Sequence, residues 1–297
     1  MMPKVSVCII TYNHERYIAS CLESVIGQKV KFPFEIIVAD DFSTDATRQI
    51  IDSYVEKYPN LIRAIYHEAN VGVCANYKAA HDAAQGDYVA HCDGDDYWYA
   101  DKLQTQVEVF DRNPGVVQCW TCADIVDDEG KKLKIFPSRL ARAVYPRTVN
   151  SKDIALSYAL VGQHSTQMYR RSARPAINDE EYLDYWVAYN LSLRGASLYL
   201  KSVNGAYRLT ASPSVTRNTS SKKKAVDYLA RHLVSIYELD STYGVYVKAN
   251  LITRFLFSRI KNHDVSEIKT SLRQLKGVRV HWLLCLKSFF YFLVQKI

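Results

Sequence analysis

Short apolar runs alternate with stretches of helical periodicity along the first 120 residues. The apolar runs predict strands at Val5–Ile10, Glu35–Ala39, Leu61–Tyr66, Asp87–Cys92 and Val116–Cys119. Between these runs, apolar side chains recur every three or four residues, first at Ile18, Leu22, Val25 and Ile26, then at Ile50, Ile51, Tyr54 and Val55, then at Ala75, Ala79, Ala80 and Ala83. Such spacing is typical of helices that cover a sheet, so the pattern predicts a doubly wound α/β fold.

The pattern changes after about residue 124 to a mixture of strands and helices. It predicts a turn at 127–130, a helix at Ser151–Leu160, a strand at Ser165–Tyr169, a helix at Glu180–Arg194 and a strand at Ser197–Lys201. Residues 211–224, rich in Ser, Thr and Lys, predict a loop, which three or four helices follow. The expected organisation is one domain over 1–210, with halves at 1–123 and 124–210, and then a helical extension over 211–297.

Polar residues stand directly after four of the predicted strands. They are Thr11-Tyr12-Asn13, Asp40-Asp41, His67 to Asn70, and Asp93 to Asp96. Parallel strands present their carboxyl ends at one edge of a sheet, and α/β sheets bind ligands at that edge. We therefore expect these side chains to line one binding cleft.

Three carboxylates fall within four residues in Asp93-Gly94-Asp95-Asp96. Their mutual repulsion favours a bound cation or hydrogen-bond donors that offset the charge. Oxygen ligands favour Mg²⁺ or Mn²⁺ over Zn²⁺, and a hard cation held by one or two carboxylates is a usual way to bind a nucleotide diphosphate. The alternative interpretation is that these residues only end a strand and cap the next helix.

The composition indicates a globular protein of the cytosol. The chain has 297 residues, of which 48% are apolar, and seven cysteines, an odd number that indicates reduced thiols. Cys119 and Cys122 have redox-motif spacing, but they follow a strand-like run instead of opening a helix, which disfavours redox chemistry. The chain starts without a signal-peptide pattern and lacks the roughly 18–20 consecutive apolar residues of a membrane span, so we expect a cytoplasmic protein.

The C-terminal residues are basic and apolar together. Residues 248–297 hold ten Lys or Arg against two acidic residues. Residues 281–297 are rich in Trp, Leu and Phe, a mixture that suits a helix lying in an anionic membrane interface, here the cytoplasmic face of the inner membrane. The alternative is a helix packed on the catalytic domain or in a homo-oligomer interface. Nucleic acid is not expected as a partner, because the tail has no recognisable binding motif.

Four motifs, in this order and spacing, resemble those of the glycosyltransferase family 2 enzymes. They are Val5 to Asn13, Asp40 to Asp45, Asn70-Val71-Gly72 with Asn76, and Gly86-Asp87-Tyr88 leading to Asp93 through Trp98. The resemblance covers roughly residues 3–210 and is strongest for bacterial members that build surface polysaccharides. It implies a GT-A fold, with a mixed sheet flanked by helices, and transfer of a sugar from a nucleotide donor with inversion.

The resemblance also implies roles for individual residues. The positions that match the family's nucleotide-binding residues are Thr11, Tyr12, Asn13, Asp41, Asn76 and Asp93. Asp41 is expected to accept a hydrogen bond from the uracil N3–H. Asp93 and Asp95 match the metal motif, with Asp95 as the principal ligand of Mn²⁺ or Mg²⁺ and Asp93 nearer the ribose or the donor sugar.

The resemblance places the catalytic base at Asp184. In the family, a Glu-Asp pair opens a helix that ends in Arg or Lys followed by Gly, and counting back from Arg194-Gly195 puts Asp184 on the Asp. Leu183 stands where the family has Glu, and the nearby carboxylates of Asp179, Glu180 and Glu181 could substitute. The alternative is that these carboxylates only interact with the dipole of a helix N-terminus.

Three further residues are candidates for the acceptor or the diphosphate. His164 belongs to the run Gln163-His164-Ser165-Thr166, which falls where relatives carry polar residues that face the acceptor. Arg208 could pair with the diphosphate, and Trp98 could form a cleft wall or stack against a sugar. For His164, an ordinary hydrogen-bonded histidine at a strand start is an equal alternative.

The expected function is metal-dependent inverting transfer of one sugar to a glycan or lipid-linked acceptor in bacterial surface polysaccharide synthesis, with a UDP-hexose or UDP-N-acetylhexosamine as the donor. The alternatives are a catalytically degenerate nucleotide-sugar-binding module and a nucleotidyltransferase. Nucleotidyltransferases normally have a Gly-rich basic loop after the first strand, and Thr11-Tyr12-Asn13-His14 is not one. Processive synthases are disfavoured, because their Gln-Xaa-Xaa-Arg-Trp motif and membrane helices are absent from the sequence.

Overall fold

The computed structural model describes residues 2–176, 182–209 and 219–296. The chain forms two compact units, and each unit is built from three separate segments of the chain. The first unit consists of Met1–Phe136, Gly162–Glu181 and Arg194–Leu209, and the second of Pro137–Val161, Tyr182–Leu193 and Thr210–Ile297. The expected acceptor half therefore divides between the two units, because 137–161 and 182–193 group with the C-terminal helices.

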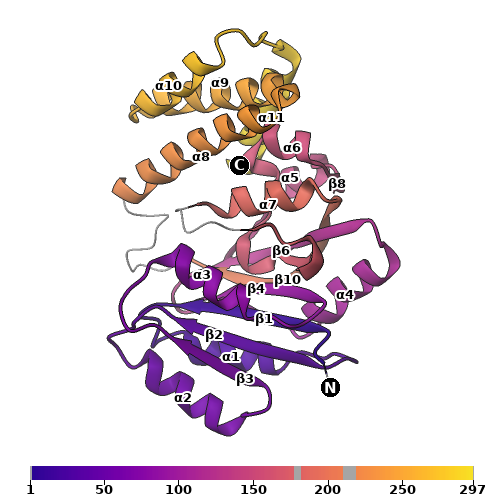
Figure 1. Ribbon diagram of the computed structural model, residues 1–297, viewed down its shortest axis with the longest axis vertical. Coiled ribbons are helices and arrows are strands. Elements are labelled where there is room, and N and C mark those ends of the chain that lie inside the picture. The colour runs from indigo at the N-terminus through magenta and orange to yellow at the C-terminus, as the bar shows by residue number, and fades with distance from the viewer. Residues whose placement is uncertain (1, 177–181, 210–218, 297) are drawn as a thin grey trace. The chain divides into compact units, whose positions relative to one another are not determined.

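Four parallel strands form one half of the sheet in the first unit (Figure 1). They are β1 (Val5–Thr11), β2 (Phe34–Asp40), β3 (Ile62–Tyr66) and β4 (Tyr88–Asp93), in the spatial order β3-β2-β1-β4. Every residue of β1 is buried, which explains its unbroken apolar run. The strands predicted from these runs are confirmed.

Helices cover both faces of the parallel strands. They are α1 (Ile18–Ile26), α2 (Thr47–Lys57), α3 (Val73–Asp82) and, further along, α4 (Lys102–Arg112). Figure 1 shows α3 on the opposite face of these strands from α1 and α2. Ile18, Leu22 and Val25 are fully buried on α1, so the predicted helical face is the one that packs on the sheet.

The other half of the sheet is mixed. Beyond β4, the spatial order continues β9 (Met168–Arg170), β6 (Val116–Val126), β10 (Ala196–Arg208) and β5 (Tyr97–Trp98), with β7 (Lys132–Phe136) paired to β6. Strand β9 runs antiparallel to β4 and β6, whereas β6 and β10 are parallel. The predicted turn at 127–130 connects β6 to β7, with Gly130 at φ +83°. The α/β mixed sheet is thus confirmed.

Three predicted boundaries in this half are wrong. Strand β6 continues seven residues beyond the predicted end at Cys119. The predicted strand at Ser165–Tyr169 begins instead with a 3₁₀ turn at His164–Thr166, and a second 3₁₀ turn at Arg171–Ala173 follows β9. Strand β10 continues seven residues beyond the predicted end at Lys201, through the register shifts that let it stay paired with β6.

The second unit is mainly helical. Its elements are α5 (Arg139–Val144), β8 (Thr148–Val149), α6 (Ser151–Leu156), a 3₁₀ turn at Tyr158–Leu160, α7 (Asp184–Ser192), α8 (Thr219–Leu239), a 3₁₀ turn at Ser241–Tyr243, α9 (Gly244–Ile260), α10 (Ser266–Gln274) and α11 (Trp282–Lys296). A capping box between Asn150 and Asp153 starts α6. Leu156, Ala249 and Cys285 form a small core that joins α6, α9 and α11.

The predicted loop at 211–224 is too long, because α8 already begins at Thr219. The rest of the predicted loop, 211–218, lies outside the described residues. The polar Ser and Lys residues that suggested a loop stand in the first turns of a long helix. The prediction that helices follow is confirmed by α8, α9, α10 and α11.

All seven cysteines are free thiols, as expected, and Cys119 and Cys122 both lie on β6. Among the helices of the described ranges, none has the length and apolar character needed to cross a bilayer.

Candidate functional site

The carboxyl ends of β1, β2 and β4 bring the predicted polar residues to one edge of the sheet. Thr11 pairs in register with Asp40, and Ile10 pairs with Asp93. The backbone N–H of Asp41 donates to the carbonyl of Thr11 at 3.0 Å. Residues far apart in the sequence therefore lie together at the edge of the sheet where β4 ends at Asp93.

Gly94 lets the loop after β4 pass close to β1. A Cβ atom at this position would lie 2.8 Å from Oγ1 of Thr11 and 3.0 Å from Nδ1 of His14. Both of these atoms are buried and lack a hydrogen-bond partner. Buried polar atoms without partners are rare, and they are expected where a water, an ion or a ligand is held.

Two more buried atoms without partners belong to residues near the same loop. They are Oε1 of Gln163 and Nε2 of His164. Gln163 also donates through Nε2 to Oδ2 of Asp96 at 3.4 Å. This bond places Gln163 against the segment from Asp93 to Asp96, which we call the carboxylate loop. In the described part of the chain, four unsatisfied polar atoms therefore belong to residues that border the segment from Asp93 to Asp96.

Asp93 is held as an anion by its neighbours. Ser165 donates to Oδ2 at 3.1 Å, and the His91 ring lies 3.1 Å from Oδ1. Burial alone would raise the pKa of Asp93, but the hydrogen bonds from His91 and Ser165 and the charge interactions with His91 and His164 outweigh burial and hold this pKa well below its usual value. Its carboxylate is ready to accept a hydrogen bond or a cation.

Asp95 and Asp96 meet different environments. Burial raises the pKa of Asp95, and the charge of Asp93 raises it further, although His14 and Arg208 act in the other direction. Asp96 is almost fully buried, and burial followed by the charges of Asp95 and Asp93 raises its pKa well above the usual value. Asp96 accepts the backbone N–H of Arg208 at 2.8 Å. A cation beside Asp95 would relieve this repulsion, so the donor set fits Mg²⁺ or Mn²⁺.

A chain of buried hydrogen bonds leads from Asp93 into the protein. Nδ1 of His91 lies 3.0 Å from Nε2 of His81, and Nδ1 of His81 lies 2.7 Å from the Tyr169 hydroxyl. Burial lowers the pKa of His91 to about 4 and lowers that of His81 well below its usual value, so both rings are neutral at pH 7. A consistent arrangement then has Tyr169 donating to His81, His81 to His91, and His91 to Asp93.

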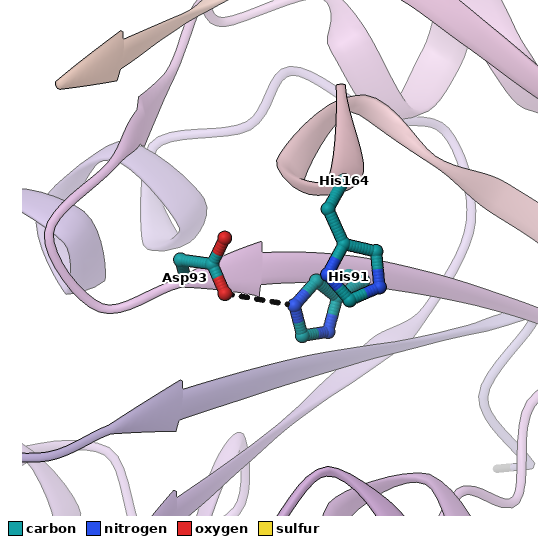
Figure 2. Close-up of side chains that lie close together, drawn as sticks. All are labelled: His91, Asp93 and His164. Atoms are coloured by element: carbon teal, nitrogen blue, oxygen red, sulfur yellow. Dashed lines mark hydrogen bonds and ion pairs between the residues drawn. The ribbon is translucent and has the colours of Figure 1, made fainter. Parts of the chain in front are cut away.

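His164 stacks on His91, one of the two histidines in this series of hydrogen bonds. Figure 2 shows its ring over that of His91, with Asp93 beside both, and the two ring centroids are 3.9 Å apart. Possible ligand atoms of His91, Asp93 and His164 all lie within 4.8 Å of one another, which is the metal-binding geometry found among the described residues. An ion bound through Nε2 of His91 would require this ring to give up the proton that it donates to Asp93.

His91 and His14 were not predicted from the sequence as site residues. Residue 91 lies inside an apolar strand, and the sequence gives no sign that it contacts the helix residue His81. For His14 a signal was present, since it directly follows the polar residues at the end of β1.

The predicted nucleotide-binding residues mostly hold loops at this edge. Both oxygens of Asp41 accept backbone N–H groups, from Val71 at 2.7 Å and Gly72 at 3.0 Å. Asn76 is buried and donates to the carbonyl of Ala39 at 3.0 Å. These contacts define the local conformation, and contact with a nucleotide stays a prediction.

Tyr12 and Asn13 are both exposed at the end of β1. Asn13 has φ +55°, and its side-chain oxygen accepts the N–H of Thr44 at 2.8 Å, while its own N–H donates to Ser43 at 2.8 Å. The loops after β1 and β2 are thereby tied together, with the Tyr12 ring open to solvent.

Arg208 and Trp98 support the carboxylate loop. Arg208 donates through Nε to the carbonyl of Asp95 at 2.9 Å and through Nη1 to those of Asp127 and Asp128. Trp98 is 4% exposed, and its Nε1 donates to the carbonyl of Ser165 at 2.8 Å. The roles predicted for them toward the diphosphate and the acceptor stay predictions.

Asp184 belongs to the second unit, where it is the first residue of α7. Its Oδ1 accepts from its neighbour Tyr185 N–H at 2.8 Å and from the Tyr158 hydroxyl at 3.3 Å. Its half-buried carboxylate is therefore oriented by two donors. The alternative carboxylates Asp179, Glu180 and Glu181 lie outside the described residues.

A family model described as glycosyl transferase family 2 matches residues 6–174, which is more than half of the chain and contains the whole carboxylate loop. The chain belongs to glycosyl transferase family 2. In this family 2 chain, the carboxylates of Asp93, Asp95 and Asp96 at the end of β4 are the basis for the function proposed below.

Curated relatives of this family 2 chain include bacterial proteins. It is 43% identical over 134 residues to an uncharacterized protein of Mycobacterium tuberculosis (strain ATCC 25618 / H37Rv), a match that covers 45% of this chain and 39% of that protein. It is 28% identical over 242 residues to TuaG of Bacillus subtilis (strain 168), provisionally named a teichuronic acid biosynthesis glycosyltransferase, with 81% and 92% coverage. The chain thus spans about two fifths of the length of the mycobacterial relatives.

Solved structures share the fold. The crystal structure of S. aureus TarS 1–349 in complex with UDP-GlcNAc matches with a TM-score of 0.59 at 24% identity, covering 82% of this chain and 70% of that one. The mannosyltransferase PcManGT from Pyrobaculum calidifontis, in complex with GDP-Man and Mn²⁺, matches with a TM-score of 0.58 at 14% identity, covering 100% and 86%. At these identities the likeness establishes the fold.

Proposed function

We propose that this family 2 chain is a metal-dependent inverting glycosyltransferase that moves one sugar from a nucleotide-diphosphate donor to a glycan or lipid-linked acceptor. The observation that carries the proposal is the loop from Asp93 to Asp96, where carboxylates at the end of β4 are bordered by residues with unsatisfied buried polar atoms. A diphosphate with its cation supplies both the positive charge and the hydrogen-bonding atoms that such a site lacks.

The similarity to TuaG supports a role in bacterial surface polysaccharide synthesis, and the fold shared with the UDP-GlcNAc complex of TarS supports a UDP-hexose or UDP-N-acetylhexosamine as donor. We expect the protein to act in the cytoplasm, where a lipid-linked acceptor would lie at the inner face of the membrane.

Asp95 would be the main ligand of Mn²⁺ or Mg²⁺, with Asp93 beside it. The Mn²⁺ of the mannosyltransferase complex supports a cation in this fold. When bound, the ion would stabilise the negative charge that collects on the leaving diphosphate. The chain's own contribution is to fix Asp93 through His91 and Ser165, and to keep Asp96 turned inward by the N–H of Arg208.

Asp184 would take the proton of the acceptor hydroxyl. The hydroxyl oxygen then forms a bond to the anomeric carbon while the bond from that carbon to the diphosphate oxygen breaks, and the electron pair leaves with the diphosphate. A single displacement from the side opposite the leaving group inverts the anomeric configuration. Tyr158 and the N–H of Tyr185 would hold the Asp184 carboxylate during this step.

The proposal is tested by nucleotide release from UDP-, GDP- and dTDP-sugars in the presence of Mn²⁺, Mg²⁺ or EDTA. Wild type is compared with Asp95→Ala and with Glu108→Ala, which removes a partly exposed carboxylate on α4 that pairs with Arg112, as a control. We expect metal-dependent release from one UDP-sugar, lost in Asp95→Ala and kept in Glu108→Ala. Absence of release from every donor, together with absence of thermal stabilisation by UDP, would support the degenerate binding module instead.

A further inference from the structure

Helix α11 exposes a stripe of large apolar side chains. Trp282, Leu283, Leu286, Phe290 and Leu293 are between 41% and 72% exposed. Four of them follow one another at intervals of four, four and three residues, so they lie along one side of the helix. We call these five residues the α11 stripe.

The rest of the helix is firmly packed within the second unit. The Phe257 ring of α9 stacks on the Phe289 ring, with ring centroids 4.8 Å apart. Its centroid lies 4.2 Å from that of the Phe292 ring. Ser288 is buried and donates to the carbonyl of Leu156 at 2.8 Å. The helix is thus apolar on both sides, and packing against its own unit accounts for only one of them.

The charge of the second unit favours an anionic partner. This unit contains 19 Lys and Arg and 7 Asp and Glu, a net charge of +12, so the first unit carries −5 of the chain's formal +7. Lys287 is exposed on α11 at the edge of the stripe, and Lys276 and Arg279 are exposed just before the helix. Basic side chains therefore stand beside the apolar ones.

We propose that the α11 stripe docks on the surface of an anionic lipid bilayer, with the helix lying in the plane of the interface. A 15-residue helix is about 22 Å long, and it would insert its Trp, Leu and Phe side chains while Lys287 and Arg279 contact the lipid headgroups. A second copy of the chain is a poorer occupant, because pairing two identical stripes brings together two units of net charge +12.

The test is flotation of the full chain with phosphatidylglycerol-containing vesicles and with purely phosphatidylcholine vesicles. The variant Trp282→Ser/Leu286→Ser/Phe290→Ser removes three of the five apolar side chains of the stripe. All three are exposed, so the fold should persist, which circular dichroism checks. The control is Val73→Ser/Leu133→Ser, which removes apolar side chains of similar exposure, 56% and 54%, from the first unit.

We expect wild type and control to float with the anionic vesicles, and the triple variant to bind at least about tenfold more weakly. Raising the salt concentration should weaken wild-type binding. Failure of the wild type to float, or equal flotation of the triple variant, would overturn the proposal. So would light scattering that shows a wild-type dimer, a monomeric triple variant and flotation of neither. Because no sugar donor is used, the result does not depend on the proposed transferase activity.

Discussion

Asp93, Asp95 and Asp96 share one loop, yet their surroundings shift their pKa values in different directions. The hydrogen bonds to Asp93 keep its pKa low, whereas burial and two neighbouring carboxylates raise the pKa of Asp96 well above its usual value. Of the three, Asp96 is therefore the carboxyl group whose neutral form is most favoured, and its Oδ1 accepts the backbone N–H of Arg208. Burial, and then the charge of Asp93, raise the pKa of Asp95, and a cation beside Asp95 would act against both.

This difference predicts that two conservative substitutions affect metal-dependent UDP binding to different extents. Asp96→Asn should leave metal-dependent UDP binding within about threefold of wild type, because an amide resembles the neutral carboxyl group and its oxygen can accept the same N–H. Asp95→Asn removes a negative ligand and should weaken this binding by about 100-fold. Titration calorimetry with UDP and Mn²⁺ measures both. Equal losses in the two variants would contradict the assignment.

At the scale of elements, the close approach of the β4 loop to β1 depends on Gly94. In Gly94→Ala the new methyl group would meet Thr11 and His14 side chains at 2.8 to 3.0 Å, so the loop would have to move. We expect at least a tenfold loss of UDP binding and destabilisation of about 1–3 kcal/mol. Gly115→Ala is the control, since nothing lies within 4 Å of its added Cβ. Chemical denaturation and calorimetry measure the two effects, and unchanged binding in Gly94→Ala would show that this contact is not needed.

The contact between α7 and α8 predicts a pH dependence of stability. Nε2 of His232 accepts the N–H of Leu183 at the start of α7, and burial lowers the pKa of His232 to about 4. Its unfolded pKa is about 6.5, so between pH 4 and 6.5 the unfolded state binds more protons. The stabilisation is therefore complete above pH 6.5 and is lost as the pH falls toward 4.

We expect this loss to be about 1 kcal/mol at pH 5, allowing for the partial exposure of the ring. His232→Gln should reduce the difference between urea unfolding at pH 7 and at pH 5 by that amount. His263→Gln, at an exposed histidine, serves as the control. An unchanged pH difference in His232→Gln would contradict the prediction.

The elements that the sequence predicts well are those in which local pattern and tertiary packing agree. The apolar run of β1 is buried along its whole length, and its polar end reaches the edge of the sheet. Strand β10 was cut short because Asn204-Gly205 interrupts its apolar pattern, although Gly205 there allows the close approach of Tyr97 and Trp98 of β5. His81 and His91 were missed for a related reason, since only the packing of α3 against β4 brings these two side chains together.

At the scale of the whole molecule, the chain crosses between its two units several times. Residues 137–161 and 182–193 join the C-terminal helices, whereas 162–181 and 194–209 join the sheet. Periodicity identifies elements but not their partners, so the sequence predicted a boundary near 210 instead. The predicted metal ligands thus belong to the first unit and the predicted base to the second, each with its own supporting contacts.

This division predicts that donor binding and sugar transfer can be separated by substitution. Asp184→Asn should leave metal-dependent UDP binding unchanged, because Asp93 and Asp95 are in the other unit, and should lower transfer to an acceptor by about 10² to 10⁴-fold. Asp95→Ala should lose both. Glu238→Gln, at an exposed carboxylate of the second unit, is the control and should affect neither. If Asp184→Asn transfers sugar at the wild-type rate, the base must be sought among Asp179, Glu180 and Glu181. Loss of UDP binding in this variant would instead mean that Asp184 contributes to holding the donor.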